Sequence, residues 1–130
     1  MKELIEGIRG FRDSCGHACR GILFAVHSQR NVRIHLLFAV IVLGVAVALK
    51  FSPVRLILVI LTIMSVIVAE LLNTALEFAM DLVEARHHPV VKTAKDIAAG
   101  GVFLAVCSSI AIGLLLFGPS LMAALRSLRN

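Results

Sequence analysis

Apolar residues gather in three long stretches of the chain, and these predict three membrane-spanning helices. The first stretch is almost uninterrupted, the second carries acidic residues only in its second half, and the third has no charge between Ile97 and Phe117. A helix needs about 20 residues to cross a hydrocarbon core about 30 Å thick. The predicted helix stops are Pro53 and the Gly118-Pro119 pair. The pattern therefore predicts spans over about 33–50, 54–83 and 96–117.

The first thirty residues follow another pattern, with apolar positions at roughly helical spacing and charged residues between them. They contain no apolar run of the length that a signal peptide needs. We predict an amphipathic helix over 4–29 that lies on the membrane surface, with glycines that permit breaks. The predicted fold class is an all-α membrane protein in which this surface helix and three transmembrane helices form one domain over 1–130.

Composition excludes other broad classes of protein. Hydrophobic residues make up 59% of the 130 residues and charged residues 16%, against about 25% charged in an ordinary globular domain. The mean hydropathy is +0.97. A soluble domain of this length could not bury so much apolar surface, and a disordered chain would be polar. The net charge of +5 is attributed to the basic flanks of membrane spans rather than to nucleic-acid binding.

The distribution of lysine and arginine predicts the orientation of the spans. Residues 1–33 and the 84–96 loop together carry nine of these residues, whereas the 50–55 turn and the C-terminal tail carry four. Positively charged flanks favour the cytoplasmic side of a membrane. We therefore expect the N-terminus and the 84–96 loop to be cytoplasmic and the C-terminus to be outside.

A stripe of polar residues along the second span is the main chemical feature of the sequence. Glu70, Asn73, Glu77, Asp81 and Glu84 are separated by 3, 4, 4 and 3 positions, which places them within about 80° on a helix. Glu70 lies deepest, between apolar neighbours, and an ionisable residue inside a span is a functional candidate. The alternative interpretation, a solvated helix end, suits Asp81 and Glu84 but suits Glu70 poorly.

The loop after this stripe adds basic residues, which suggests a site for a metal–polyphosphate ligand. Its polar residues are Arg86, His87, His88, Lys92, Lys95 and Asp96. Mg²⁺ prefers one or two carboxylates together with phosphate oxygens, and lysines and helix N-termini hold phosphates. A metal-free carboxylate at the lipid boundary could accept the proton of a lipid hydroxyl. The pattern suggests phosphoryl transfer to a lipid alcohol, although Asp96 is equally interpreted as the N-cap of the third span.

Three segments resemble the small prokaryotic integral-membrane diacylglycerol kinase family. They are ELLNTALE at 70–77 with Asp81, HP at 88–89 followed by Lys92 and AKDIAAG at 94–100, and QRNVRIH at 29–35. The resemblance covers about residues 8–117, and the RNVRIH stretch is more similar to the undecaprenol kinase branch, common in Gram-positive bacteria. The chain has neither a Walker A motif nor a G-x-G-x-x-G motif, so its nucleotide site must be built otherwise.

The resemblance implies ATP- and Mg²⁺-dependent phosphorylation of a lipid alcohol, diacylglycerol or undecaprenol, at the cytoplasmic face of the cell membrane. It also implies a homotrimer with active sites shared between subunits. By resemblance Glu70 is the catalytic base and Glu77 a metal ligand, while Gln29 stands where the family has a second metal carboxylate. The implied nucleotide-binding residues are His17, Gln29, Glu77, Arg86, His87, His88, Lys95 and Asp96. Asn73, Asp81 and Lys92 are the other implied active-site residues.

The replacement at Gln29 and the position of Glu70 inside a span leave two alternative functions open. Glutamine offers an oxygen without charge to a metal, so Asp81 could substitute as the second acidic ligand. A non-catalytic membrane subunit would also be compatible with Gln29. A small proton-coupled transporter could use Glu70 as its protonation site. Such a transporter would not need the further acidic residues that follow Glu70 on the same helix face, nor the A-K-D segment at 94–96.

Overall fold

The computed structural model describes residues 1–83 and 88–128, and these form four helices. The helices are α1 (Lys2–Ser28), α2 (Arg30–Ala48), α3 (Pro53–Val83) and α4 (Pro89–Leu128). The prediction of an all-α fold is therefore confirmed. Three of the helices, α2, α3 and α4, are long and apolar enough to cross a membrane.

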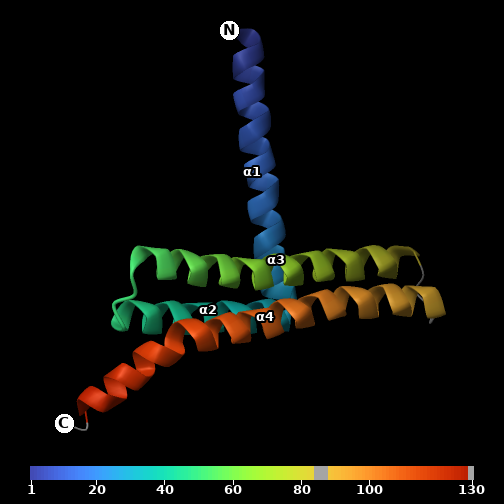
Figure 1. Cartoon of the computed structure of the whole chain (residues 1–130). Coiled ribbons are helices and arrows are strands. Elements are labelled where there is room, and N and C mark those ends of the chain that lie inside the picture. The colour runs from blue at the N-terminus through green and yellow to red at the C-terminus, as the bar shows by residue number, and fades with distance from the viewer. Residues whose placement is uncertain (84–87, 129–130) are drawn as a thin grey trace.

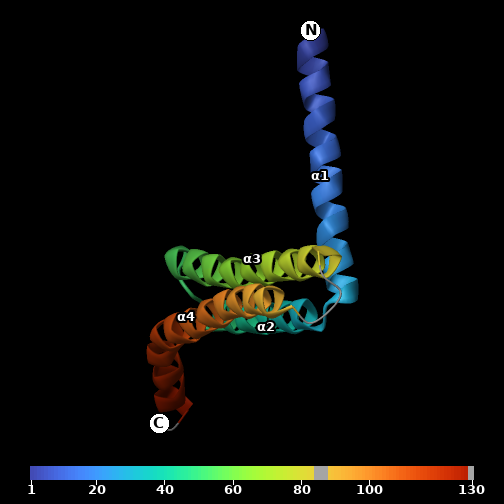
Figure 2. The ribbon, with the colours of Figure 1, turned by 90° about the vertical axis from the view of Figure 1, so that its right-hand side faces the viewer.

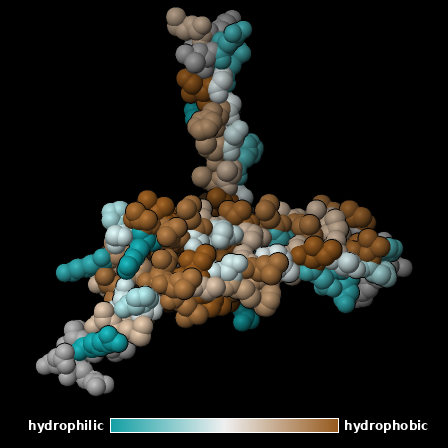
Figure 3. Space-filling model, viewed as in Figure 1, coloured by the Kyte–Doolittle hydropathy of each residue, from teal (hydrophilic) through white to brown (hydrophobic). Residues whose placement is uncertain are grey.

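The three apolar helices run side by side as a bundle, and α1 stands away from it (Figures 1 and 2). Most apolar side chains of the bundle point outward, so its surface is largely hydrophobic (Figure 3). Phe103 and Leu104 are both 67% exposed, and Leu115 is 78% exposed. Water would penalise so large an apolar surface, whereas lipid chains would not. The chain is a membrane protein.

A tight connection joins α2 to α3 at one end of the bundle, which we call the distal end. The N–H of Phe51 donates to the carbonyl of Ala46 (3.1 Å) and the N–H of Lys50 to that of Val47 (2.9 Å). Lys50 has a φ of 53°, so the pattern is a Schellman motif with lysine at the position that glycine usually occupies. Pro53 begins α3, where its missing N–H costs nothing.

The buried core of the bundle lies near this connection. Ala46, Phe51 and Val59 are at most 7% exposed and form one cluster, against which Leu116 and Phe117 of α4 pack. The rings of Phe51 and Phe117 are 4.7 Å apart between centroids. The burial of Phe51, a residue of the connection, thus holds α2, α3 and α4 together at the distal end.

The end of α1 packs against the half of α3 that carries the acidic residues. The rings of Phe24 and Phe78 are 5.5 Å apart, and Ala25 is 3% exposed. The side chain of Arg33 donates to the carbonyls of Val26 (3.3 Å) and His27 (2.8 Å), which are otherwise unpaired groups of a helix end. These contacts fix the corner between α1 and α2. Helix α1 is continuous through its glycines, so the permitted breaks do not occur.

Helix α4 differs from the predicted third span at both ends. It begins at Pro89 rather than near 96 and continues through Pro119 to Leu128 rather than ending at 117. A proline inside a helix removes one backbone hydrogen bond and bends the axis but need not end the helix, and the last part of α4 turns away from the bundle (Figures 1 and 2). Because α4 starts before Asp96, the interpretation of Asp96 as an N-cap is wrong.

Candidate active site

The polar stripe of α3 includes the most deeply buried polar side chains of the described chain. Glu70 is 2% exposed and Asn73 is 8% exposed, as the position of Glu70 between apolar neighbours suggested. Thr74, which the sequence did not single out, is 5% exposed. Threonine is common in apolar helices, so the sequence alone does not mark Thr74 as a candidate site residue.

Two oxygen atoms of this stripe are buried without a hydrogen-bond partner in the part of the chain that the structure describes. They are Oε2 of Glu70 and Oδ1 of Asn73. A buried polar atom that is left unpaired costs about 1–3 kcal/mol, and such a cost is offset when a ligand supplies the missing partner. These oxygens are therefore available to a hydroxyl donor or to a cation.

Asn73 also orients the next acid along the stripe. Its Nδ2 donates to Oε1 of Glu77 over 3.0 Å, a pairing across one helical turn. The bond engages one carboxylate oxygen of the half-buried Glu77, and no hydrogen bond to the other comes from the described residues. Sequence spacing placed these two residues on one face, and the structure brings them into contact.

The oxygens of this region fit the ligand chemistry of a hard divalent cation. Carboxylate and amide oxygens are the protein ligands that Mg²⁺ prefers, usually one or two of them together with phosphate oxygens and water. Within residues 1–83 and 88–128, no group of three or more His, Cys, Asp or Glu side chains could hold a metal ion. A metal held by these described residues would need further ligands, such as phosphate oxygens, amide oxygens or groups outside them.

An ion pair connects the stripe to α4. Nζ of Lys95 donates to Oδ1 of Asp81, and the side chains are 32% and 61% exposed. A second pair within α4 joins Lys92 to Asp96 over 3.9 Å. The four predicted residues Asp81, Lys92, Lys95 and Asp96 thus occur as two pairs at the end of the bundle opposite the distal end.

Gln29 lies in the corner between α1 and α2. Its backbone is extended (φ −105°, ψ 121°), its N–H donates to the carbonyl of Ala25 (2.8 Å), and it is half-buried. The contact between Phe24 and Phe78 places this corner beside the acid-bearing half of α3.

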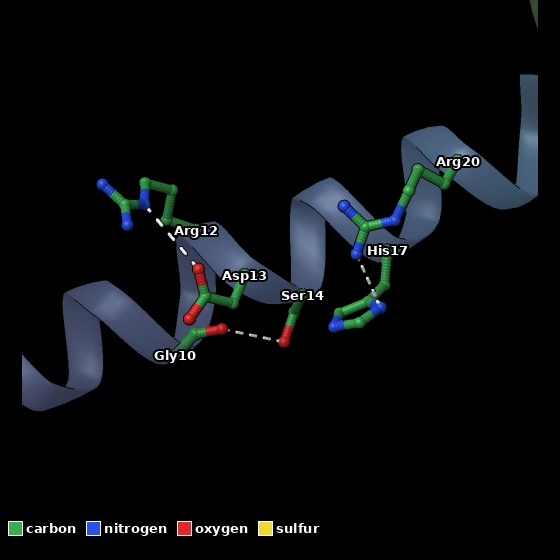
Figure 4. A network of polar contacts seen from close by, with 6 residues as sticks. All are labelled: Gly10, Arg12, Asp13, Ser14, His17 and Arg20. Atoms are coloured by element: carbon green, nitrogen blue, oxygen red, sulfur yellow. Dashed lines mark hydrogen bonds and ion pairs between the residues drawn. The ribbon is translucent and has the colours of Figure 1, made fainter.

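His17 lies far from the stripe within one chain. It is exposed on α1, three helical turns before Gln29, and Arg20 donates to its Nδ1 over 2.9 Å (Figure 4). Neighbouring polar contacts on α1 are equally local: Ser14 bonds the carbonyl of Gly10, and Arg12 lies 3.8 Å from Asp13 (Figure 4). The structure of one chain therefore does not bring His17 to Glu70 or Glu77.

The predicted loop residues are only partly described. His88 is exposed, and its Nδ1 accepts a hydrogen bond from the N–H of Val90 (3.3 Å) just inside α4. Arg86, His87 and Glu84 lie outside the described residues.

An apolar cavity of about 420 Å³ opens between α2, α3 and α4. Its lining includes Ile34 and Phe38 of α2, Val66 and Ile67 of α3, and Ile110 of α4. Its polar lining residues are His35, Thr62 and Ser109. The two hydroxyls donate to carbonyls of their own helices, and the other lining residues are apolar. Val66 and Ile67 are one turn before Glu70, about 5 Å along α3.

The sequence is similar to known lipid kinases over most of its length. The profile of the family described as prokaryotic diacylglycerol kinase matches residues 16–117. The undecaprenol kinase of Bacillus subtilis is 40% identical over 111 residues, which cover 85% of this chain and 90% of that protein. A diacylglycerol kinase of Synechocystis sp. is 39% identical over 108 residues (82% of this chain and 62% of that protein). A diacylglycerol kinase of Pseudomonas aeruginosa is 30% identical over 100 residues, covering 77% of this chain and 81% of that protein.

Proposed function

The chain belongs to the prokaryotic diacylglycerol kinase family and is a lipid kinase, and we propose that it transfers the γ-phosphate of ATP to the hydroxyl of undecaprenol or diacylglycerol. The observation that carries this proposal is the buried, unpartnered Oε2 of Glu70, one helical turn from an apolar cavity. A lipid alcohol has a hydroxyl attached to an apolar chain. The carboxylate oxygen suits the hydroxyl, and the apolar cavity suits the chain.

Glu70 is the proposed catalytic base. Its burial excludes bulk water from Oε2, so the carboxylate can accept a hydrogen bond from the lipid hydroxyl. It would then take the hydroxyl proton as the new P–O bond forms and the bond between the γ-phosphorus and the bridging oxygen breaks, with ADP as the leaving group. The apolar tail lies in the cavity lined by Val66 and Ile67. Tail binding therefore positions the hydroxyl, and positioning is the main requirement of phosphoryl transfer.

The residues proposed to hold Mg²⁺ are Glu77 and Gln29, with Asp81 as an alternative acid. When bound, Mg²⁺ neutralises charge on the phosphates. Asn73 orients Glu77 through the bond of 3.0 Å. Gln29 offers a neutral oxygen, and its corner is held beside this half of α3 by the Phe24–Phe78 contact.

The nucleotide phosphates are proposed to lie against α4 and the loop before it. Lys95 donates to the transferring phosphate after leaving Asp81, its partner in the structure. Lys92 and His88, both exposed near the start of α4, contact the outer phosphates, and Asp96 keeps Lys92 in place. Arg86 and His87 complete this group in the proposal.

A homotrimer with shared sites accounts for the position of His17. Helix α1, which carries His17, stands away from the bundle that contains the acidic stripe (Figures 1 and 2), so a nucleotide contact by His17 requires a neighbouring subunit or a different direction of α1. The uneven distribution of basic residues supports a cytoplasmic N-terminus and active site in the cell membrane, with the C-terminus outside.

The proposed function is tested with purified protein in lipid–detergent micelles. Undecaprenol and diacylglycerol are supplied in separate reactions with labelled ATP and Mg²⁺. We expect label in the lipid monophosphate, and we expect its formation to stop when EDTA removes the metal. Failure to label either alcohol under conditions in which the protein remains folded would refute the proposal.

A further inference from the structure

Helix α4 is longer than a membrane requires. Its 40 residues correspond to about 60 Å, about twice the thickness of a hydrocarbon core. The charged residues Lys92, Lys95 and Asp96 occupy its beginning, and its uncharged apolar stretch ends at Phe117. The segment 118–128 therefore emerges at the distal end of the bundle, opposite the candidate active site.

Side-chain contacts fix the point at which this segment leaves the bundle. Phe117 packs on Phe51, and Nη1 of Arg55 donates to the hydroxyl of Ser120 (3.3 Å). The guanidinium of Arg55 also lies 5.7 Å from the ring centroid of Phe51. The last part of α4, which contains Pro119, turns away from the bundle (Figures 1 and 2), and these contacts lie where it leaves.

The distal end combines exposed apolar side chains with charge of one sign. Leu121 and Met122 are 45% and 57% exposed, while Lys50, Arg55 and Arg126 are also exposed. None of the eight acidic residues of the sequence lies within 49–55 or 118–130. Hydrophilic side chains are visible at both ends of the bundle, the distal end included, with a largely apolar surface between them (Figure 3). This combination is typical of segments that lie in the interface of a bilayer.

We propose that the distal end binds the phosphate groups of anionic phospholipids, in the leaflet opposite the candidate active site, and that residues 118–128 lie along the bilayer surface. Leu121 and Met122 enter the apolar layer, while Lys50 and Arg126 contact the phosphates. Arg55 has further N–H donors beyond the one it gives to Ser120, and a guanidinium suits phosphate oxygens. No acidic residue lies within 49–55 or 118–130, so no carboxylate side chain of these segments repels the lipid phosphates.

The depth of the segment can be measured directly because the chain contains no tryptophan. Leu121→Trp introduces a single fluorophore, and Leu104→Trp, at a residue 67% exposed within the apolar part of α4, provides the matched control. Both variants are reconstituted in phosphatidylcholine vesicles that contain some phosphatidylglycerol, with bromine near the headgroup or deep in the acyl chains. We expect the Leu121→Trp variant to be quenched best by the shallow bromine and the control by the deep one. Solvent-like emission at position 121, unquenched by either lipid, would overturn the proposal.

The preference for anionic lipid is measured in the same Leu121→Trp protein. Brominated phosphatidylglycerol in plain phosphatidylcholine is compared with the same fraction of brominated phosphatidylcholine in plain phosphatidylglycerol. We expect stronger quenching by phosphatidylglycerol, and we expect Lys50→Gln and Arg126→Gln each to reduce the preference up to about fivefold. Retained lipid kinase activity of these variants shows that they are folded. Equal quenching by both lipids in the parent protein would contradict a phosphate-binding surface.

Discussion

Asn73 donates a hydrogen bond to Glu77 across one turn of α3, from Nδ2 to Oε1 over 3.0 Å. The bond orders a half-buried carboxylate on the helix that also carries two buried oxygens without a partner among the described residues. It connects the proposed metal ligand with the deeper part of the stripe, where Glu70 lies.

Asn73→Ala is expected to lower the affinity of the site for Mg²⁺ more than it lowers the stability of the fold. Loss of a group that orients a metal ligand typically costs about 10–100-fold in metal affinity. We expect the Mg²⁺ concentration for half-maximal lipid phosphorylation to rise at least about tenfold. Ser65→Ala, an exposed position on the same helix, serves as the control. An unchanged Mg²⁺ requirement in the Asn73 variant would show that Glu77 needs no orientation or binds no metal.

Gln29→Glu tests whether the corner between α1 and α2 belongs to the metal site. An added carboxylate raises the charge of a cation site and hence its affinity. We expect half-maximal activity at a lower Mg²⁺ concentration than in the parent protein, whereas Gln29→Ala is expected to need more. Mg²⁺ titrations of lipid phosphorylation that coincide for all three proteins would remove Gln29 from the site.

Lys95 is expected to contribute to activity by binding a phosphate of ATP rather than by stabilising the fold through its ion pair with Asp81. The pair with Asp81 is largely exposed, and such pairs contribute about 0–1 kcal/mol to stability. A charged hydrogen bond to phosphate contributes more, about 1.5–3 kcal/mol. We therefore expect Lys95→Met to lower kcat/KM for ATP about tenfold to a hundredfold. Lys50→Met, which removes an exposed cation at the distal end, provides the control, and similar losses in the two variants would refute a specific role for Lys95.

Lys50→Gly tests the end of α2 independently of the active site. Lys50 adopts a left-handed conformation (φ 53°), which costs a side-chain-bearing residue about 1–2 kcal/mol. We expect Lys50→Gly to unfold at a higher denaturant concentration than Lys50→Ala, since both variants lose the charge and differ only in the Cβ atom. Identical unfolding curves in detergent micelles would show that the motif carries no strain.

The fold could be predicted largely from apolar runs, because lipid-exposed backbone must satisfy its hydrogen bonds within each helix. The second span, expected over 54–83, agrees with α3 at Pro53–Val83. The ends of α4 could not be predicted in the same way. A run of apolar residues marks the part of a helix inside the hydrocarbon core, and it does not show how far the helix continues beyond the core. Pro119 was taken as a stop, but a helix can tolerate one lost hydrogen bond.

The site could be predicted where it depends on one helix and not where it depends on several. The spacing of four between Asn73 and Glu77 placed them on one face, and they are in contact. The pair of Asp81 and Lys95 joins two helices, so it depends on how the chain reverses between them, which residue spacing does not encode. The burial of Phe51 could not be predicted either, because Phe51 lies in a connection between helices and such connections are usually exposed.

The most direct test of the central claim is the lipid kinase activity of Glu70→Gln. Glutamine keeps the size of the side chain and removes its ability to accept the hydroxyl proton, and loss of a general base typically lowers the rate about 10²–10⁴-fold. Turnover of undecaprenol and diacylglycerol with labelled ATP is compared with that of Glu6→Gln, the same change at an exposed residue of α1. The account predicts a loss of this size for Glu70→Gln in a protein that remains folded in detergent, with normal activity for Glu6→Gln. Near-normal turnover of Glu70→Gln would contradict the account.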